Sequence, residues 1–161
     1  MNIVIERATA SDADAIVRLV HELAESSGGT ADVHAAYVRS WLAFPGRTVL
    51  LAAAADGAPG SAAVDSTATG GRIGLLAFSL NPNLYHAADG CLIEDLYVRP
   101  AWRGKGVGRA LVAWVMDQAA RQGWAEVSVS TGRDNRPALS LYHGLGLVEE
   151  YVLLEKHFGD G

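Results

Sequence analysis

The most informative part of the sequence is the run Glu94-Asp95-Leu96-Tyr97-Val98-Arg99-Pro100-Ala101-Trp102-Arg103-Gly104-Lys105-Gly106-Val107-Gly108-Arg109. Its pattern is typical of a strand, a glycine-rich turn and the start of a helix. Such a turn exposes backbone N–H groups at a helix N-terminus, where they bind anions. Its glycines also let the backbone approach a phosphate closely. We therefore expect a phosphate-binding turn between Arg103 and Gly108.

The charges around this turn favour the same interpretation. Arg103, Lys105 and Arg109 crowd the positive end of the predicted helix dipole. A cation at that end costs about 0.3 kcal/mol or more, and a bound polyanion would remove the conflict. The alternative is a solvated, charged loop in which the glycines serve only the turn.

Two common phosphate-binding motifs fit the turn poorly. A P-loop requires Ser or Thr after Gly-Lys, whereas Gly106 follows Lys105 here. The dinucleotide fingerprint lies after a first strand, but these glycines lie in the second half of the chain and have a different spacing. A nucleotide-binding protein is therefore disfavoured.

The rest of the chain alternates between strand and helix patterns. Apolar spacing predicts helices at 12–25, 33–42, 106–122 and 137–144. Strands are expected at 2–6, 48–55, 72–80, 91–98, 125–130 and 147–155. This order indicates one α/β domain, spanning residues 1–161, built on a mixed sheet.

Turn and cap residues set the expected boundaries of these elements. Ser11 and Asp14 resemble a capping box before the first helix, and Gly123 suits the C-terminal cap of the third. Asn81-Pro82-Asn83 predicts a turn between two strands, and the small-residue stretch 56–71 is interpreted in part as a mobile hairpin connection.

Composition narrows the function classes. Half of the 161 residues are hydrophobic and 19% are charged, which is typical of a globular domain. A net charge of -5 disfavours general nucleic-acid binding.

The single Cys91 excludes an internal disulfide and a cysteine-based zinc cluster, and no histidine shows metal-ligand spacing. Neither a bilayer-spanning apolar run nor a signal peptide is visible, so we expect a cytoplasmic protein without metal or membrane association.

Two motifs carry a resemblance to a known family. Arg103-x-x-Gly106-x-Gly108 resembles the Arg/Gln-x-x-Gly-x-Gly/Ala signature of the GNAT N-acetyltransferase superfamily. The run from Asn135 to Tyr142 resembles its second motif, Asn-x-x-Ala-x-x-Leu-Tyr. The resemblance covers residues 91–155, and the run 74–108 is most similar to the diamine/polyamine acetyltransferase-like branch. It implies a mostly antiparallel central sheet flanked by about four helices.

The resemblance also implies acetyl-CoA as cosubstrate. The turn would bind its pyrophosphate, and a bulged, splayed strand would open a slot for the pantetheine arm, with a backbone N–H near Val98 on the thioester carbonyl. Asn135 would contact the pantetheine chain, although a turn or helix-cap role is the alternative. The implied cofactor-binding residues are Leu96, Tyr97, Val98, Arg103, Gly104, Lys105, Gly106, Val107, Gly108, Arg109 and Asn135.

Acetyl transfer to an amine needs two proton transfers. Neutral alkylamine is scarce at pH 7, at a cost of about 4–5 kcal/mol, and a carboxylate can take its proton directly or through water. Glu94 matches the catalytic Glu of the polyamine branch, with Asp95 as reserve base or amine-binding anion. Adjacent strand residues point to opposite faces, so only one carboxylate faces the slot unless a bulge intervenes. Tyr142 occupies the family position for protonating the departing thiolate.

We therefore expect an acyl-CoA-dependent N-acetyltransferase that acts by direct attack in a ternary complex. The expected acceptor is a small cationic amine, and aminoglycosides, amino acids and protein N-termini remain open. His21, Glu22 and Glu25 would line its pocket or form a solvated face. A non-catalytic acyl-CoA sensor is the alternative class. A homodimer through the C-terminal strands is a family-level expectation, compatible with the apolar run Tyr151-Val152-Leu153-Leu154.

Overall fold

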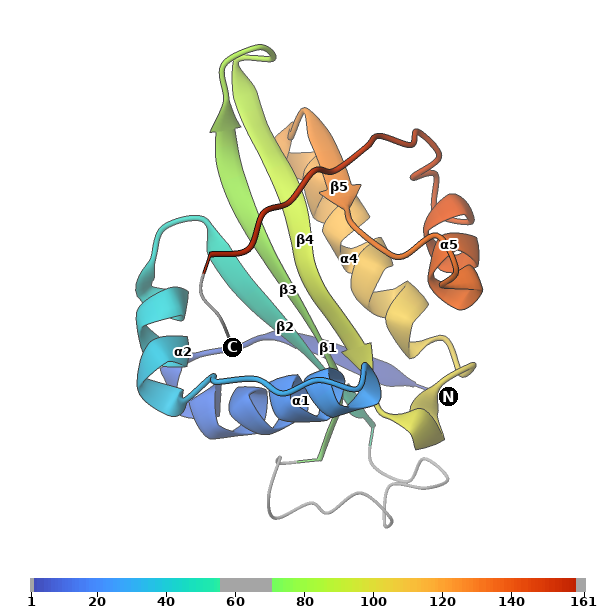
Figure 1. The fold of residues 1–161 in the computed structure, drawn as a ribbon. Coiled ribbons are helices and arrows are strands. Elements are labelled where there is room, and N and C mark those ends of the chain that lie inside the picture. The colour runs from blue at the N-terminus through green and yellow to red at the C-terminus, as the bar shows by residue number, and fades with distance from the viewer. Residues whose placement is uncertain (1, 56–70, 159–161) are drawn as a thin grey trace.

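The computed structural model describes residues 2–55 and 71–158, and their framework is a five-stranded sheet (Figure 1). The strands lie in chain order: β1 (Ile3–Arg7), β2 (Arg47–Ala54), β3 (Arg72–Asn83), β4 (Ala88–Val98) and β5 (Glu126–Val129). The first four pair antiparallel, and β5 runs parallel to β4. The expected mixed, mostly antiparallel sheet is confirmed.

Four helices in the described ranges cover the two faces of this sheet (Figure 1). They are α1 (Ala13–Ser26), α2 (Ala35–Ala43), α4 (Val107–Gln122) and α5 (Arg136–His143). Short 3-10 turns at Ala10–Asp12 and Pro100–Trp102 precede α1 and the glycine-rich turn. None of the helices in these ranges is long and apolar enough to cross a membrane.

Two apolar cores explain why the central strands read as unbroken hydrophobic runs. Leu50 and Leu76 face one core with Leu111 of α4, whereas Leu51 and Leu75 face the other with α1 and α2. A strand that is buried on both faces needs apolar residues at successive positions rather than at every second one. These cores fix β3 and β4 between the helices, and thereby fix the strand that carries the candidate site.

Two expected turn and cap positions are wrong. The cap before α1 lies earlier than Ser11 and Asp14, because the backbone N–H of Thr9 donates to Asp12 Oδ2 at 2.8 Å around the 3-10 turn. β3 does not turn at 81–83 but pairs with β4 as far as Asn83. Pro82 is tolerated there because β2 pairs with β3 only up to Ser79, so that no strand of the described ranges pairs with this edge of β3 at Pro82.

The strand expected at 147–155 is also wrong. Residues 147–158 form neither helix nor strand, and Tyr151 and Leu154 are 86% and 88% exposed. An apolar run predicts a strand only where another strand is available to pair with it, and the described part of the chain supplies none. The hairpin connection expected at 56–71 lies outside the described residues except for Gly71.

Candidate active site

A β-bulge in β4 places two carboxylates on one face of the sheet. Ala77 of β3 pairs with Asp95, while the next residue, Phe78, pairs with Ile93, so Glu94 is the extra residue. Without the bulge, neighbouring side chains would point to opposite faces. Glu94 instead bonds to Ser79 on the α1/α2 face, and Asp95 is in register with Ala77 of that same face. The bulge that the sequence left open is present, and it brings both acids together.

The two acids have different surroundings. Ser79 donates a hydrogen bond of 2.6 Å from its hydroxyl to Glu94 Oε1, and Asn81 Nδ2 donates to the same hydroxyl at 3.4 Å. The pKa of Asp95 lies above its ordinary value, first because of desolvation and second because of the negative charge on Glu94. A carboxylate with a raised pKa is a stronger base. Ser79, only 6% exposed, was missed by the sequence reasoning, because its role depends on strand register.

The C-terminal half of β4 has an open edge. β5 pairs with β4 only from Gly90↔Glu126 to Ile93↔Val129, so residues 94–98 have no partner strand on that side in the described structure. Leu96 and Val98 pack against the α4-side core, whereas Tyr97 points into the α1/α2 core. The side chain of Tyr97 therefore lies on the opposite face from α4. The pairing of β4 with β5 stops because β5 itself ends at Val129, and the splay of the two strands stays a prediction.

The glycine-rich turn leads directly into α4. Gly104 and Gly106 have φ values of 71° and 87°, in the left-handed region that favours glycine. The amide of Ala110 donates to Gly106 O at 2.9 Å, so the preceding amides of Val107, Gly108 and Arg109 are the first of the helix and lack intrahelical acceptors. The Val107 side chain is buried in the core and anchors this end.

The predicted cations surround this helix end. Arg103 Nε donates to Val98 O at 2.9 Å and its guanidinium lies 5.8 Å from the Tyr97 ring centroid. Lys105 Nζ lies 5.2 Å from the ring centroid of Trp102, and Arg109 reaches the end of α5 beside Gly144. Within the described ranges, none of the three cations has a carboxylate within ion-pair distance. The turn thus combines open amides with uncompensated positive charge, as an anion site requires.

Tyr142 lies on α5, and its side chain packs into the α4-side core. Tyr142 is only 6% exposed, and burial raises the pKa of its phenol. No hydrogen bond to the Tyr142 hydroxyl occurs among the described residues, yet no fully buried polar side-chain atom there lacks a partner. The hydroxyl therefore reaches solvent while the ring is packed, and its raised pKa keeps the proton available.

Asn135 has a structural role in positioning Tyr142. Its Oδ1 accepts a hydrogen bond of 3.3 Å from the backbone N–H of Ala138 and so caps the N-terminus of α5. The helix-cap role, the alternative to a cofactor contact, is therefore present. Leu141, in the same helix, approaches within 3.4 Å of the position that a Cβ on Gly108 would take, so α5 packs tightly against the start of α4.

Two of the three α1 residues named for an acceptor pocket, Glu22 and His21, contact other parts of the chain. Glu22 forms a two-point ion pair with Arg99, with distances of 2.6 and 3.0 Å. His21 Nε2 lies 3.2 Å from the Val33 carbonyl oxygen. Glu22 therefore ties α1 to the end of β4 rather than forming a solvated face. In the described ranges, no group of three His, Cys, Asp or Glu side chains is arranged to hold a metal ion.

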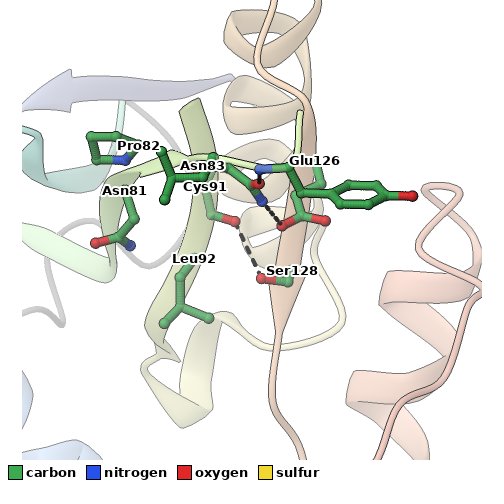
Figure 2. Close-up of a pocket in the computed structure, with 10 residues that line it drawn as sticks. Asn81, Pro82, Asn83, Cys91, Leu92, Glu126 and Ser128 are labelled. Atoms are coloured by element: carbon green, nitrogen blue, oxygen red, sulfur yellow. Dashed lines mark hydrogen bonds between the residues drawn. The ribbon is translucent and has the colours of Figure 1, made fainter. Parts of the chain in front are cut away.

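A pocket of about 540 Å³ opens on the sheet face that carries Glu94, at the end away from the glycine-rich turn (Figure 2). It lies between the tip of the β3–β4 hairpin and β5, and the glycine-rich turn takes no part in it. Its lining residues include Asn81, Asn83, Leu92, Glu126 and Ser128. Sequence reasoning assigned Asn81 and Asn83 only to a turn and gave none of these residues a part in a site, because only the pairing of β3, β4 and β5 brings them together.

Comparison with known proteins identifies relatives of this arrangement. Residues 18–147 match the family model described as the acetyltransferase (GNAT) family. Thialysine N-epsilon-acetyltransferase of Bos taurus is 33% identical over 54 residues, which is 34% of this chain and 32% of that protein. The chain matches only about a third or less of the length of its curated relatives.

Solved structures share the fold over nearly the whole chain. An aminoglycoside acetyltransferase from an uncultured soil metagenomic sample, in complex with trehalose, superposes with a TM-score of 0.76 at 18% identity, covering 99% of this chain and 97% of that one. AAC(6')-Iy in complex with a CoA-S-monomethyl-acetylneamine bisubstrate analog gives 0.74 at 20% identity, covering 99% and 100%. At these identities the likeness concerns the fold.

Proposed function

Since the chain belongs to the acetyltransferase (GNAT) family, we propose that it transfers the acetyl group of acetyl-CoA to a primary amine by direct attack in a ternary complex. The observation that carries this proposal is the β4 bulge. It puts Glu94 and Asp95 on the α1/α2 face of the sheet, whereas Tyr142 packs on the α4 face. The two proton tasks of amide formation are thereby divided between the two sides of one strand.

The residues around the turn fit the cosubstrate. Open amides at the start of α4 and the charges of Arg103, Lys105 and Arg109 would hold the pyrophosphate. The unpaired edge of β4 at residues 94–98 would receive the pantetheine arm, with a backbone N–H near Val98 on the thioester carbonyl. When bound, acetyl-CoA supplies the activated acetyl group.

The chain's own groups then handle the protons. Glu94 takes the proton of the acceptor ammonium, directly or through a water molecule, and Asp95 beside it attracts the cation and serves as reserve base. Tyr142 gives a proton to the departing thiolate, which needs only weak acid help because a thiol has a pKa near ~8.5. A sensor that only binds acyl-CoA would need neither an open Tyr142 hydroxyl nor paired acids, so these features support an enzyme.

The proposed acceptor is a small cationic amine. The two acids at the bulge form no ion pair within the described residues, which leaves their charge for a ligand. Thialysine and aminoglycosides, named for the similar proteins, are both amines. Amino acids and protein N-termini remain the other candidates.

A panel of amines tests the proposed function. Acetyl-CoA is incubated with the protein and each amine in turn, and free thiol is followed. We expect thiol release that depends on a primary amine. Binding of coenzyme A without thiol release on any amine would instead favour a sensor, and tight ATP binding without affinity for coenzyme A would favour a nucleotide-binding protein.

Replacing one glycine tests the phosphate-binding turn. Gly106→Ala forces a side chain into the left-handed region at φ 87°, which costs about 1–2 kcal/mol and displaces the first amides of α4. We expect coenzyme A affinity, measured by calorimetry, to fall about tenfold. Gly123→Ala is the matched control, because Gly123 has a φ of 70° at the other end of α4 with open space around it. An equal loss of coenzyme A affinity in both variants would count against the turn as the phosphate-binding site.

The exposed C-terminal run supports a homodimer. Tyr151, Val152, Leu153 and Leu154 are all more than half exposed, although apolar residues of this size are usually buried. We propose that a second copy covers them, and we expect light scattering to give twice the mass of one chain. Leu154→Asp should then return the mass to that of a monomer, whereas a wild-type monomer would refute the dimer. Cytoplasmic location stays a prediction.

A further inference from the structure

An ion pair fixes the C-terminal part of α1 to the end of β4, just ahead of the glycine-rich turn. Glu22 of α1 accepts two hydrogen bonds from the guanidinium of Arg99, at 3.0 Å from Nε and 2.6 Å from Nη2. Two bonds of this kind fix the orientation of both side chains. The side chains are largely shielded, with 32% and 16% exposed, and in Figure 1 the C-terminal end of α1 lies beside the arrowhead of β4. This geometry makes the pair a fixed contact, unlike most exposed ion pairs.

The ring of Tyr97 connects this ion pair with the turn. It packs in the α1/α2 core with Leu19 of α1, and the guanidinium of Arg103 lies 5.8 Å from the ring centroid. The pKa of the phenol lies above its ordinary value, first because of desolvation and second because of the negative charge of Glu22, while the charges of Arg103 and Arg99 act in the opposite direction. The ring therefore has Glu22 near its hydroxyl and Arg103 within cation–π distance.

Arg103 is held against the end of the sheet. Its Nε donates to Val98 O at 2.9 Å, and its backbone N–H donates to Pro100 O at 3.2 Å. Both contacts draw the residue back to the strand end that the ion pair fixes. Gly104 follows with a φ of 71°, so the position of Arg103 sets the direction in which the turn leaves the sheet.

These contacts link α1 to the proposed coenzyme A site, so the inference rests on the proposed function. We propose that Glu22 is a positioning residue for the coenzyme A-binding turn. It fixes the guanidinium of Arg99 and lies near the hydroxyl of Tyr97, whose ring holds Arg103 ahead of the first amides of α4. In this role Glu22 touches neither the cosubstrate nor the reacting atoms. It keeps the turn in the conformation that binds the pyrophosphate.

The charge of Glu22 gives the expected effect a distinctive sign. Coenzyme A is a polyanion, and by Coulomb's law alone the removal of a nearby negative charge should strengthen its binding. A positioning role has the opposite sign, because loss of the carboxylate releases Arg99 and the Tyr97 hydroxyl and loosens the turn. The direction of the change in coenzyme A affinity therefore distinguishes the two effects.

Calorimetry with coenzyme A, without any acceptor, tests the role of Glu22. We expect Glu22→Gln to bind coenzyme A about three- to tenfold more weakly than the wild type does. Glu22→Asp keeps the charge but draws the carboxylate back by one methylene, and an intermediate loss is expected. Glu6→Gln is the matched control, because it makes the same charge change and breaks the 2.6 Å ion pair of Glu6 with Arg72, whose side chain is similarly shielded. Its coenzyme A affinity should equal that of the wild type.

A double variant separates positioning of the turn from a general loss of structure. If Glu22 acts through Arg103, then Arg103→Met and the double variant Glu22→Gln/Arg103→Met should bind coenzyme A equally weakly. The second change then has nothing left to act on. A general loss of structure would instead make the two losses of affinity additive and lower the thermal unfolding temperature in step.

The outcomes separate this inference from the proposed function. Coenzyme A binding that is unchanged or tighter in Glu22→Gln, or additive losses in the double variant, would overturn the positioning role while leaving the transferase intact. If the protein binds coenzyme A but no amine releases thiol, the proposed catalysis fails, and the same affinities still decide the role of Glu22. A wild-type protein without affinity for coenzyme A would overturn both.

Discussion

Replacing Tyr142 with phenylalanine should lower turnover by about ten- to a thousandfold, because the variant cannot protonate the departing thiolate. The ring of Tyr142 is packed in the core, and phenylalanine fills the same space. Because its hydroxyl makes no hydrogen bond within the described structure, the substitution should cost little stability. The measurement is kcat from thiol release, with thermal unfolding followed in parallel.

Coenzyme A affinity provides the control for this variant. A proton donor acts on the leaving group, so Tyr142→Phe should bind coenzyme A nearly as tightly as the wild type does. A variant with unchanged turnover would remove Tyr142 from the mechanism. A large loss of affinity without a change in kcat would assign it to binding instead.

Removing the proposed base, Glu94, should lower activity as much as Tyr142→Phe does, or more. Glu94→Gln is expected to lower kcat/KM by about 10²- to 10⁴-fold at neutral pH, since the ammonium proton would lose its acceptor. Asp95→Asn should have a smaller effect, because Glu94 keeps its place in the bulge and its hydrogen bond from Ser79. The two variants are isosteric and change the net charge equally, so each is the control for the other.

The pH profile of the same two variants identifies the base. A base works only when it is deprotonated, so the rate falls as the pH drops through its pKa. The negative charge of Glu94 helps to raise the pKa of Asp95, and residual activity that depends on Asp95 should therefore shift to lower pH in Glu94→Gln. If Asp95→Asn is the more damaging change, Asp95 is the base and the assignment to Glu94 is wrong.

Local chemistry explains which parts of the site could be predicted. The turn at 103–108 needs glycines at positive φ, and Gly123 caps α4 in the left-handed region for the same reason. Such requirements depend on a few neighbouring residues, so they are visible in the sequence. The expected helices at 12–25 and 106–122 correspond to α1 and α4 with small shifts at their ends.

Features that depend on pairing between distant segments were not predictable. The bulge lies at Glu94 because of how β3 and β4 align, and the contact with Ser79 joins residues 15 positions apart. The pocket between the hairpin tip and β5 likewise forms only when β3, β4 and β5 pair. The run at 151–154 illustrates the reverse error, because its apolar residues match a strand pattern but no described strand pairs with them.

A crystal structure with coenzyme A bound tests the central claim most directly. Our account predicts pyrophosphate oxygens within hydrogen-bond distance of the amides at the start of α4, with the pantetheine arm running along the free edge of β4 towards Glu94. The same crystals with the turn empty, and the coenzyme A bound elsewhere on the protein, would contradict it.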